Sequence, residues 1–101
     1  MSDWMAALYR TCTQVLEGDP ALIAQLRAAG FECYEAHWSF RLPAVHGWLA
    51  GRVATPDYPV FLQQLYAGEL NSRLAQLGAQ IAIADNRGKV SESLYRLQRL
   101  P

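Results

Sequence analysis

The sequence predicts a small α+β domain, with about three helices packed on one face of a mostly antiparallel sheet that includes a C-terminal β-hairpin. Three observations lead to this prediction. Apolar residues recur at helical spacing in the first 30 residues and again from residue 58. A strict two-residue alternation runs from residue 34 to residue 42, and turn residues interrupt an apolar run near residue 85. The length of 101 residues predicts a single domain over residues 1–101.

The composition excludes several classes of protein. Hydrophobic residues make up 51% of the chain and charged residues 18%, which is not the composition of a disordered chain. Nine basic and nine acidic residues give a formal net charge of zero, so the protein is neither strongly basic nor strongly acidic. No apolar run is long enough for a transmembrane helix, and the first ten residues lack the basic start of a signal peptide. A soluble, cytoplasmic protein is therefore expected.

Two helices are expected at the start of the chain. The first covers residues 3–16 and has Ser2 or Asp3 as its cap. The second begins after Asp19 with a proline in its first turn, and it ends at Gly30. The residues predicted to face the core from the first helix are Met5, Leu8, Cys12, Val15 and Leu16.

A single long strand is expected over residues 31–42. The side chains predicted to share its apolar face are Tyr34, Ala36, Trp38, Phe40 and Leu42. The opposite face holds Cys33, Glu35, His37, Ser39 and Arg41. This second face is polar, so it is expected to meet water, a partner or a ligand.

The middle of the chain is less clear. Residues 43–53 fit either a helical turn or a turn followed by a strand, and we favour the strand because two glycines in one short helix cost about 1 kcal/mol each relative to alanine. A helix is expected over residues 58–77, and Gly68 either bends it or splits it in two.

The last segment is predicted to form a β-hairpin, with residues 79–84 paired to residues 89–96 through a turn at Asn86 and Gly88. A helix over residues 91–100 is the alternative, because its leucines also fit a helical stripe. The side chains expected in the core from the strands and the long helix are Trp38, Phe40, Leu62, Leu65, Leu74 and Ile83.

The polar strand face holds the best candidate site. Glu35, His37, Ser39 and Arg41 project from it at two-residue steps, about 6–7 Å apart. A carboxylate beside an imidazole can orient it as a general base, and an arginine can hold an anionic group. The set therefore predicts a small-molecule site or a weak hydrolytic site. The solvent side of a half-covered sheet carries such residues as well.

No metal or cofactor is predicted. Cys33, His37 and His46 lack the short spacing of metal ligands, and no glycine-rich phosphate loop occurs. The two cysteines, Cys12 and Cys33, are expected to be free and buried, as small apolar side chains are in a reducing compartment.

The C-terminal part predicts a nucleic-acid-binding alternative. Residues 70–101 carry five basic and two acidic residues, a net charge of +3, whereas residues 1–40 carry two arginines and five acids, a net charge of −3. A helix followed by a hairpin resembles a winged helix, with Arg73 on the helix and Arg87 and Lys89 at the wing. The zero net charge of the whole chain makes nucleic-acid binding an unfavoured alternative.

The function we predict is that of a non-enzymatic binding or adaptor module that self-associates as a homodimer. Three tryptophans, five tyrosines and three phenylalanines in so short a chain are too many to be fully buried. Exposed aromatic patches are typical of protein interfaces. The site on the polar strand face and the winged helix remain the two alternatives.

Overall fold

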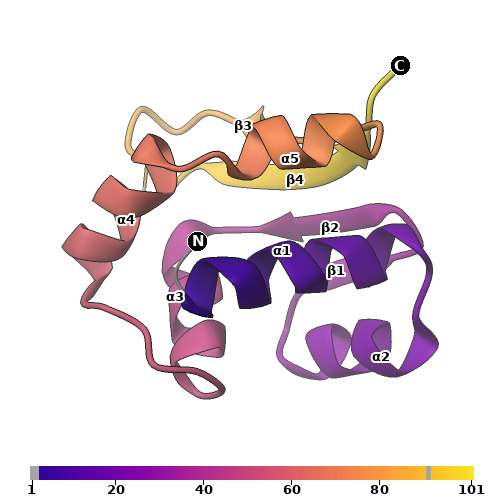
Figure 1. Cartoon of the computed structure of the whole chain (residues 1–101), viewed down its shortest axis with the longest axis horizontal. Coiled ribbons are helices and arrows are strands. Elements are labelled where there is room, and N and C mark those ends of the chain that lie inside the picture. The colour runs from indigo at the N-terminus through magenta and orange to yellow at the C-terminus, as the bar shows by residue number, and fades with distance from the viewer. Residues whose placement is uncertain (1–2, 91) are drawn as a thin grey trace.

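The computed structural model describes residues 3–90 and 92–101, and in them the chain forms five helices and four strands (Figure 1). The helices are α1 (Asp3–Leu16), α2 (Pro20–Ala28), α3 (Leu42–Ala50), α4 (Tyr58–Ala67) and α5 (Leu70–Gln76). The strands are β1 (Glu32–Tyr34), β2 (His37–Phe40), β3 (Ala79–Asp85) and β4 (Leu94–Arg99). The predicted α+β class is confirmed, whereas the predicted number of about three helices is too low.

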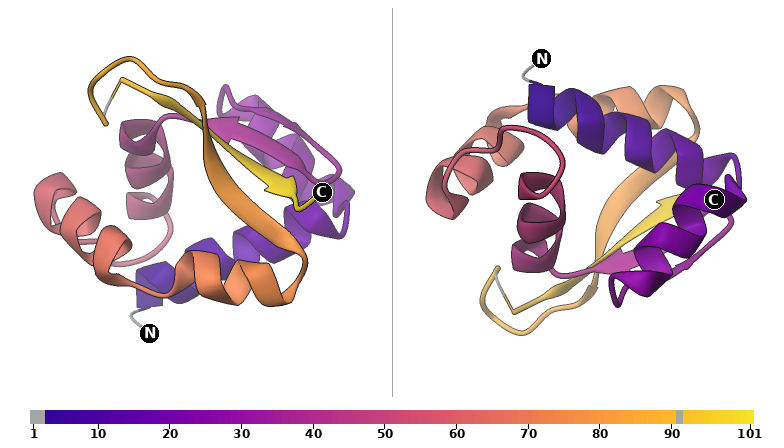
Figure 2. Two further views of the ribbon diagram at one scale, coloured as in Figure 1. Left: turned by 90° about the horizontal axis from the view of Figure 1, so that it is seen from above. Right: turned by 90° about the horizontal axis from the view of Figure 1, so that it is seen from below.

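The four strands form one antiparallel sheet in the order β1-β2-β4-β3. Trp38 of β2 lies opposite Leu97 of β4, and Leu97 lies opposite Ile81 of β3. Helix α1 packs against β2 and β4, and α5 packs against β3, so that both lie in front of the sheet in Figure 1. The views in Figure 2 show the strong twist of the strands.

One hydrophobic core lies between this side of the sheet and the helices. All three tryptophans, Trp4, Trp38 and Trp48, are buried in it. Trp38 is fully buried, and its ring lies 4.7 Å from that of Phe40 and 6.4 Å from that of Trp48 between centroids. The exposed aromatic residues are Tyr34 and Tyr66, so the expectation that some aromatic side chains stay outside the core holds for tyrosines and not for tryptophans.

The first two helices follow the prediction closely. Every residue expected on the apolar face of α1 is buried. Asp19 caps α2, because its Oδ1 accepts from the backbone N–H groups of Ala21 at 3.1 Å and Leu22 at 3.3 Å. Gly18, between the helices, has a φ of 75°, a conformation in which glycine avoids the strain of a side chain. The cap proposed at Ser2 lies outside the described residues.

The single strand expected over residues 31–42 is wrong, because the chain folds back on itself at Glu35 and Ala36. Tyr34 lies opposite His37 in the resulting hairpin, and Ala36 has a φ of 60°. The backbone N–H of Ala36 donates to the carbonyl of Val15 at 2.9 Å, which fixes the turn against α1. The reversal puts Tyr34 on the face of His37, where it is 49% exposed, and puts Cys33 in the core.

The strand favoured within residues 43–53 is also wrong, because residues 42–50 form α3. Pro43 occupies the first turn, and Gly51 lies at the end of the helix, so that Gly47 is the one glycine in its interior. The helix buries Leu42, Val45, Trp48 and Leu49. Burial of four large side chains at helical spacing outweighs the roughly 1 kcal/mol lost at one glycine.

The long helix expected over residues 58–77 is split at Gly68 into α4 and α5. A side chain at Gly68 would lie 2.8 Å from Cε and 2.9 Å from Sδ of Met5, so α1 approaches this junction closely. Leu74 is buried as predicted, whereas Leu62 and Leu65 are half-buried at the edge of the core.

The predicted C-terminal hairpin is confirmed, with β3 paired to β4, but its second strand covers Leu94–Arg99 and not residues 89–96. The connection between the two strands is therefore longer than the predicted turn at Asn86 and Gly88. Strand β4 replaces the alternative helix over residues 91–100, of which residue 91 lies outside the described part of the chain. Ile83 was expected in the core and is 55% exposed, because it lies on edge strand β3 beyond the part that α5 covers. Among the described residues, no helix has the length and apolar character needed to cross a membrane.

Candidate functional site

Two of the four residues predicted on the polar strand face contact each other. Nε2 of His37 lies 3.1 Å from Oγ of Ser39. Nε of Arg96 donates to the same Oγ at 3.3 Å, and Oε2 of Glu32 lies 3.8 Å from Nε2 of His37. We refer to Glu32, His37, Ser39 and Arg96 as the open-face cluster, since they lie on the side of the sheet opposite the core.

The other two predicted residues, Glu35 and Arg41, lie elsewhere. Glu35 is in the turn of the first hairpin, with its side chain beside Gly18. Nε of Arg41 donates to the carbonyl of Glu92 at 3.3 Å. The carboxylate that approaches His37 is that of Glu32, because the hairpin places Glu32 opposite Ser39. Sequence reasoning missed Glu32 because it assumed one continuous strand.

The open-face cluster does not have the geometry of a serine hydrolase. In such an enzyme, one imidazole nitrogen contacts the serine and the other contacts the carboxylate. Here Ser39 and Glu32 both approach Nε2, Ser39 is only 4% exposed, and the ring of Tyr34 stacks on that of His37 at 4.1 Å between centroids. The contacts of the cluster therefore join neighbouring strands, and the hydrolytic alternative stays a prediction without a matching geometry.

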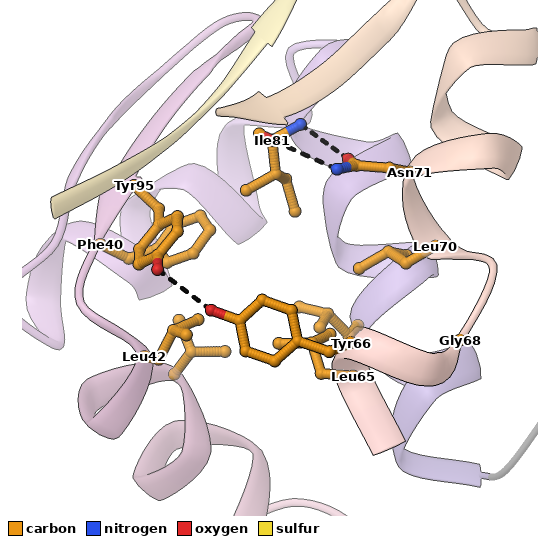
Figure 3. Close-up of a pocket in the computed structure, with 11 residues that line it drawn as sticks. Phe40, Leu42, Leu65, Tyr66, Gly68, Leu70, Asn71, Ile81 and Tyr95 are labelled. Carbon is orange, nitrogen blue, oxygen red and sulfur yellow. Dashed lines mark hydrogen bonds between the residues drawn. The ribbon is translucent and has the colours of Figure 1, made fainter. Parts of the chain in front are cut away.

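A pocket of about 200 Å³ lies on the core side of the sheet, between the strands and helices α4 and α5 (Figure 3). It is lined by side chains from α1 and α3, from the strands and from the α4–α5 segment, and it is partly open to solvent. Its lining residues are Leu8, Phe40, Leu42, Val45, Leu65, Tyr66, Gly68, Leu70, Asn71, Ile81 and Tyr95. Among the described residues, none of these eleven is charged.

Two pairs of hydrogen-bonding groups lie on different sides of this pocket, as Figure 3 shows. The hydroxyl oxygens of Tyr66 and Tyr95 lie 3.2 Å apart. Oδ1 of Asn71 accepts from the backbone N–H of Ile81 at 2.9 Å, and Nδ2 of Asn71 donates to the carbonyl of Ile81 at 3.3 Å. The first pair joins α4 to β4, and the second joins α5 to β3. We call this site the Tyr66–Tyr95 pocket.

The fold positions the two tyrosines from segments far apart in the sequence. Tyr66 lies in the last turn of α4, just before the break at Gly68, and is 62% exposed. Tyr95 lies on β4 opposite Phe40 and is buried. Burial, and then the hydrogen bond with Tyr66, raise the pKa of Tyr95 to about 12. The Tyr95 hydroxyl therefore faces the pocket in a setting that disfavours its ionisation.

Sequence reasoning missed this pocket. Tyr66 lies within the helix expected over residues 58–77 and Tyr95 within the strand expected over residues 89–96, and 29 positions separate the two tyrosines. No spacing rule connects residues at that distance. The one local signal was Gly68, whose predicted break in the helix turns α5 away from α4 and leaves the space beside Leu70.

A second hollow of about 380 Å³ lies between α1, α2 and the end of α3. It is more polar, and its side chains are largely bound to one another. The guanidinium of Arg52 lies 3.9 Å above the ring centroid of Trp48 and donates to the Trp48 carbonyl at 3.2 Å. Nε2 of Gln14 donates to Oδ2 of Asp19 at 3.2 Å. Neither hollow is lined by His37 or Ser39.

The three residues of the nucleic-acid alternative are exposed and come from two segments of the chain. Arg73 is on α5, whereas Arg87 and Lys89 are in the connection between β3 and β4. Nε of Arg87 lies 2.8 Å from Oδ2 of Asp85, so an acid already neutralises this arginine. Nucleic-acid binding, which the zero net charge of the chain disfavours, stays an untested alternative.

Within residues 3–90 and 92–101, no group of three or more histidine, cysteine or acidic side chains is placed to hold a metal ion. Cys33 is in the core, His37 lies on the opposite face of the sheet, and Nε2 of His46 donates to the carbonyl of Pro56 at 2.7 Å. Comparisons with protein families, with curated proteins and with solved structures give no match.

Proposed function

We propose that the protein is a non-enzymatic binding module, and that the Tyr66–Tyr95 pocket holds a small, largely apolar molecule. The observation that carries the proposal is an uncharged, mainly apolar pocket of about 200 Å³ lined by side chains of the core. Folded domains leave few voids larger than a water molecule, since core side chains interdigitate. A space of this size, walled by leucine, valine, isoleucine and aromatic side chains, favours an apolar occupant.

The volume limits the size of the ligand. An apolar cavity of about 150 Å³ accepts benzene. The pocket of about 200 Å³ therefore accommodates one monocyclic ring with a short substituent, and a larger molecule would have to displace Tyr66 or Leu70. A ligand of about nine heavy atoms is expected to bind with a Kd of about 10 μM to 1 mM.

Calorimetric titration with acetophenone tests the proposal, because this molecule has the expected size. Ile81→Trp fills the pocket, since Ile81 lines it. Ile83→Trp is the matched control, because Ile83 lies two residues further along the same strand on the same face, is 55% exposed and is not among the lining residues. We expect binding to the wild type and to Ile83→Trp, and at least tenfold weaker binding to Ile81→Trp.

Two results would contradict the proposal: acetophenone that fails to bind the wild-type protein, or acetophenone that binds Ile81→Trp as tightly as Ile83→Trp. Leu65→Trp and Leu62→Trp form a second pair, in case Ile81→Trp does not fold. Both leucines are half-buried, but Leu65 lines the pocket and Leu62 is not among its lining residues. The amide dispersion of each variant in an NMR spectrum shows whether it is folded.

Self-association remains the second part of the proposal. Three large side chains, Tyr34, Tyr66 and Ile83, are between 49% and 62% exposed, and tyrosine is enriched at protein interfaces. Sedimentation equilibrium at high micromolar concentration is expected to give twice the chain mass of 11.3 kDa. A species of 11.3 kDa would exclude the dimer and leave the pocket untouched. The free, buried cysteines Cys12 and Cys33 are compatible with the proposed cytoplasmic location.

A further inference from the structure

The arrangement of hydroxyl groups in the pocket limits the chemistry of its ligand. Each tyrosine hydroxyl has one proton, and the oxygens of Tyr66 and Tyr95 are 3.2 Å apart. One hydroxyl donates its proton to the other hydroxyl oxygen, so that this proton is not available to a ligand. The second hydroxyl keeps its proton, so one O–H donor remains whichever tyrosine donates within the pair.

The remaining polar side chain of the pocket is already engaged. The amide of Asn71 uses its oxygen to accept from Ile81 and one of its two N–H groups to donate to Ile81. The backbone of Ile81 is bound in the same way and points toward Asn71 in Figure 3. Because the amide of Asn71 is held against the Ile81 backbone, the hydroxyl pair is the polar contact that we assign to a ligand.

No countercharge is available to an ionised ligand, because none of the lining residues is charged. Transfer of an isolated carboxylate or ammonium group from water into such a site is strongly unfavourable. Ionisation of the Tyr95 hydroxyl is also disfavoured, because burial raises the pKa of Tyr95 to about 12. The pocket thus distinguishes neutral molecules from charged molecules of the same shape.

We propose that the ligand of the Tyr66–Tyr95 pocket is a neutral molecule with an apolar body and one hydrogen-bond acceptor, such as a ketone, aldehyde or ester oxygen, that accepts the unshared tyrosine proton. This inference rests on the proposed function of the pocket. It adds a specific requirement, since an apolar pocket alone would take hydrocarbons of the same size equally well.

Three probes of nearly equal shape test the requirement. Acetophenone has a carbonyl acceptor, isopropylbenzene has a methyl group in place of that oxygen, and benzoate has a negative charge. The protein is compared with the variants Tyr66→Phe, Tyr95→Phe and the double variant. Each single variant keeps one hydroxyl, and the double variant keeps none. Binding is followed by NMR titration of the 15N-labelled protein.

We expect acetophenone to bind the double variant about five- to tenfold more weakly than the wild type, which is the usual effect of one lost hydrogen bond. Each single variant is expected to lose less than the double variant, because the remaining hydroxyl still donates. Isopropylbenzene is expected to bind all four proteins within twofold, which also shows that the pocket stays intact. Benzoate is expected to bind the wild type at least tenfold more weakly than acetophenone.

Several outcomes would overturn the inference and are distinguishable from failure of the proposed function. If acetophenone and isopropylbenzene both bind and neither responds to the double variant, the pocket binds ligands but the hydroxyls do not select them. Equal losses for both probes would show general damage to the pocket in place of a lost hydrogen bond. Benzoate that binds as tightly as acetophenone would exclude the requirement for a neutral ligand. If neither neutral probe binds the wild type, the proposed function itself is wrong.

Discussion

The side-chain amide of Asn71 pairs with the backbone of Ile81 as a neighbouring strand would. Its oxygen accepts from the Ile81 N–H at 2.9 Å, and its nitrogen donates to the Ile81 carbonyl at 3.3 Å. Strand β3 is an edge of the sheet, and an unpaired edge can pair with another chain. The other edge, β1, has only three residues. Asn71 therefore occupies the part of β3 where a second chain would pair.

Replacement of Asn71 tests this relationship. Asn71→Ala removes both hydrogen bonds to Ile81, and we expect the free energy of unfolding to fall by about 1–2 kcal/mol. We also expect faster aggregation on heating, because the edge of β3 is then free. Ser72→Ala, one residue further along α5 and also exposed, is the control for urea denaturation and light scattering. Equal stability and equal aggregation of the two variants would show that Asn71 does not protect the edge.

Trp38 is expected to be the residue on which the core depends most. It is fully buried, and it contacts the rings of Phe40 and Trp48. Trp38→Ala should lower the free energy of unfolding by about 3–5 kcal/mol in urea denaturation. Val60→Ala, at an exposed position of α4, should change it by less than about 0.5 kcal/mol. A Trp38→Ala variant as stable as the parent would contradict the placement of this side chain.

The two thiols should be unreactive in the folded protein. Cys12 and Cys33 are almost completely buried, and burial raises the pKa of Cys12 to about 12 and that of Cys33 above its usual range. The thiolate is the reactive form, so neither cysteine should react with Ellman's reagent at pH 8 within minutes. Both should react at once in denaturant. Rapid modification of either cysteine under native conditions would show that the packing of α1 and β1 is looser than described.

Stability should fall at alkaline pH. The pKa of Tyr95 in the folded protein is raised to about 12, from 10 in the unfolded chain. The unfolded chain therefore loses its proton first, and the free energy of unfolding decreases as the pH rises from about 10 to about 12. Tyr95→Phe removes this contribution, and its stability should depend less on pH in that range. Urea denaturation of the two proteins between pH 9 and 11.5, with Tyr34→Phe as the exposed control, measures the difference. Parallel pH profiles would contradict the burial of the Tyr95 hydroxyl.

The first hairpin shows why part of the candidate site was predictable and part was not. Alternation predicted correctly that Trp38 and Phe40 share the core face and that His37 and Ser39 share the other face. The two-residue turn that begins at Glu35 leaves the predicted faces of the residues after it unchanged. The residues before the turn lie on the face opposite to the one predicted for a continuous strand. The pattern of apolar residues is compatible with one long strand and with two short strands. Tertiary contacts decide which of the two structures forms.

Residues 42–50 show the limit of local preferences. The glycines at 47 and 51 argued for a strand, and this was wrong because Gly51 lies at the end of α3 and the buried face of α3 compensates for Gly47. Such compensation depends on what the helix packs against, here α1 and α4. The Tyr66–Tyr95 contact could not be predicted from local sequence, since it exists only after α4 has packed beside the sheet.

The most direct test of the binding function is the position of a bound probe in the wild-type protein. Intermolecular nuclear Overhauser effects from acetophenone to the methyl groups of Leu8, Leu70 and Ile81 are predicted, because these side chains line one pocket from α1, α5 and β3. The methyl groups of Val60 and Ile83, which are exposed and are not among the lining residues, should show none. Contacts confined to Val60, Ile83 or other surface residues, or no contacts at saturating probe, would contradict the pocket as the binding site.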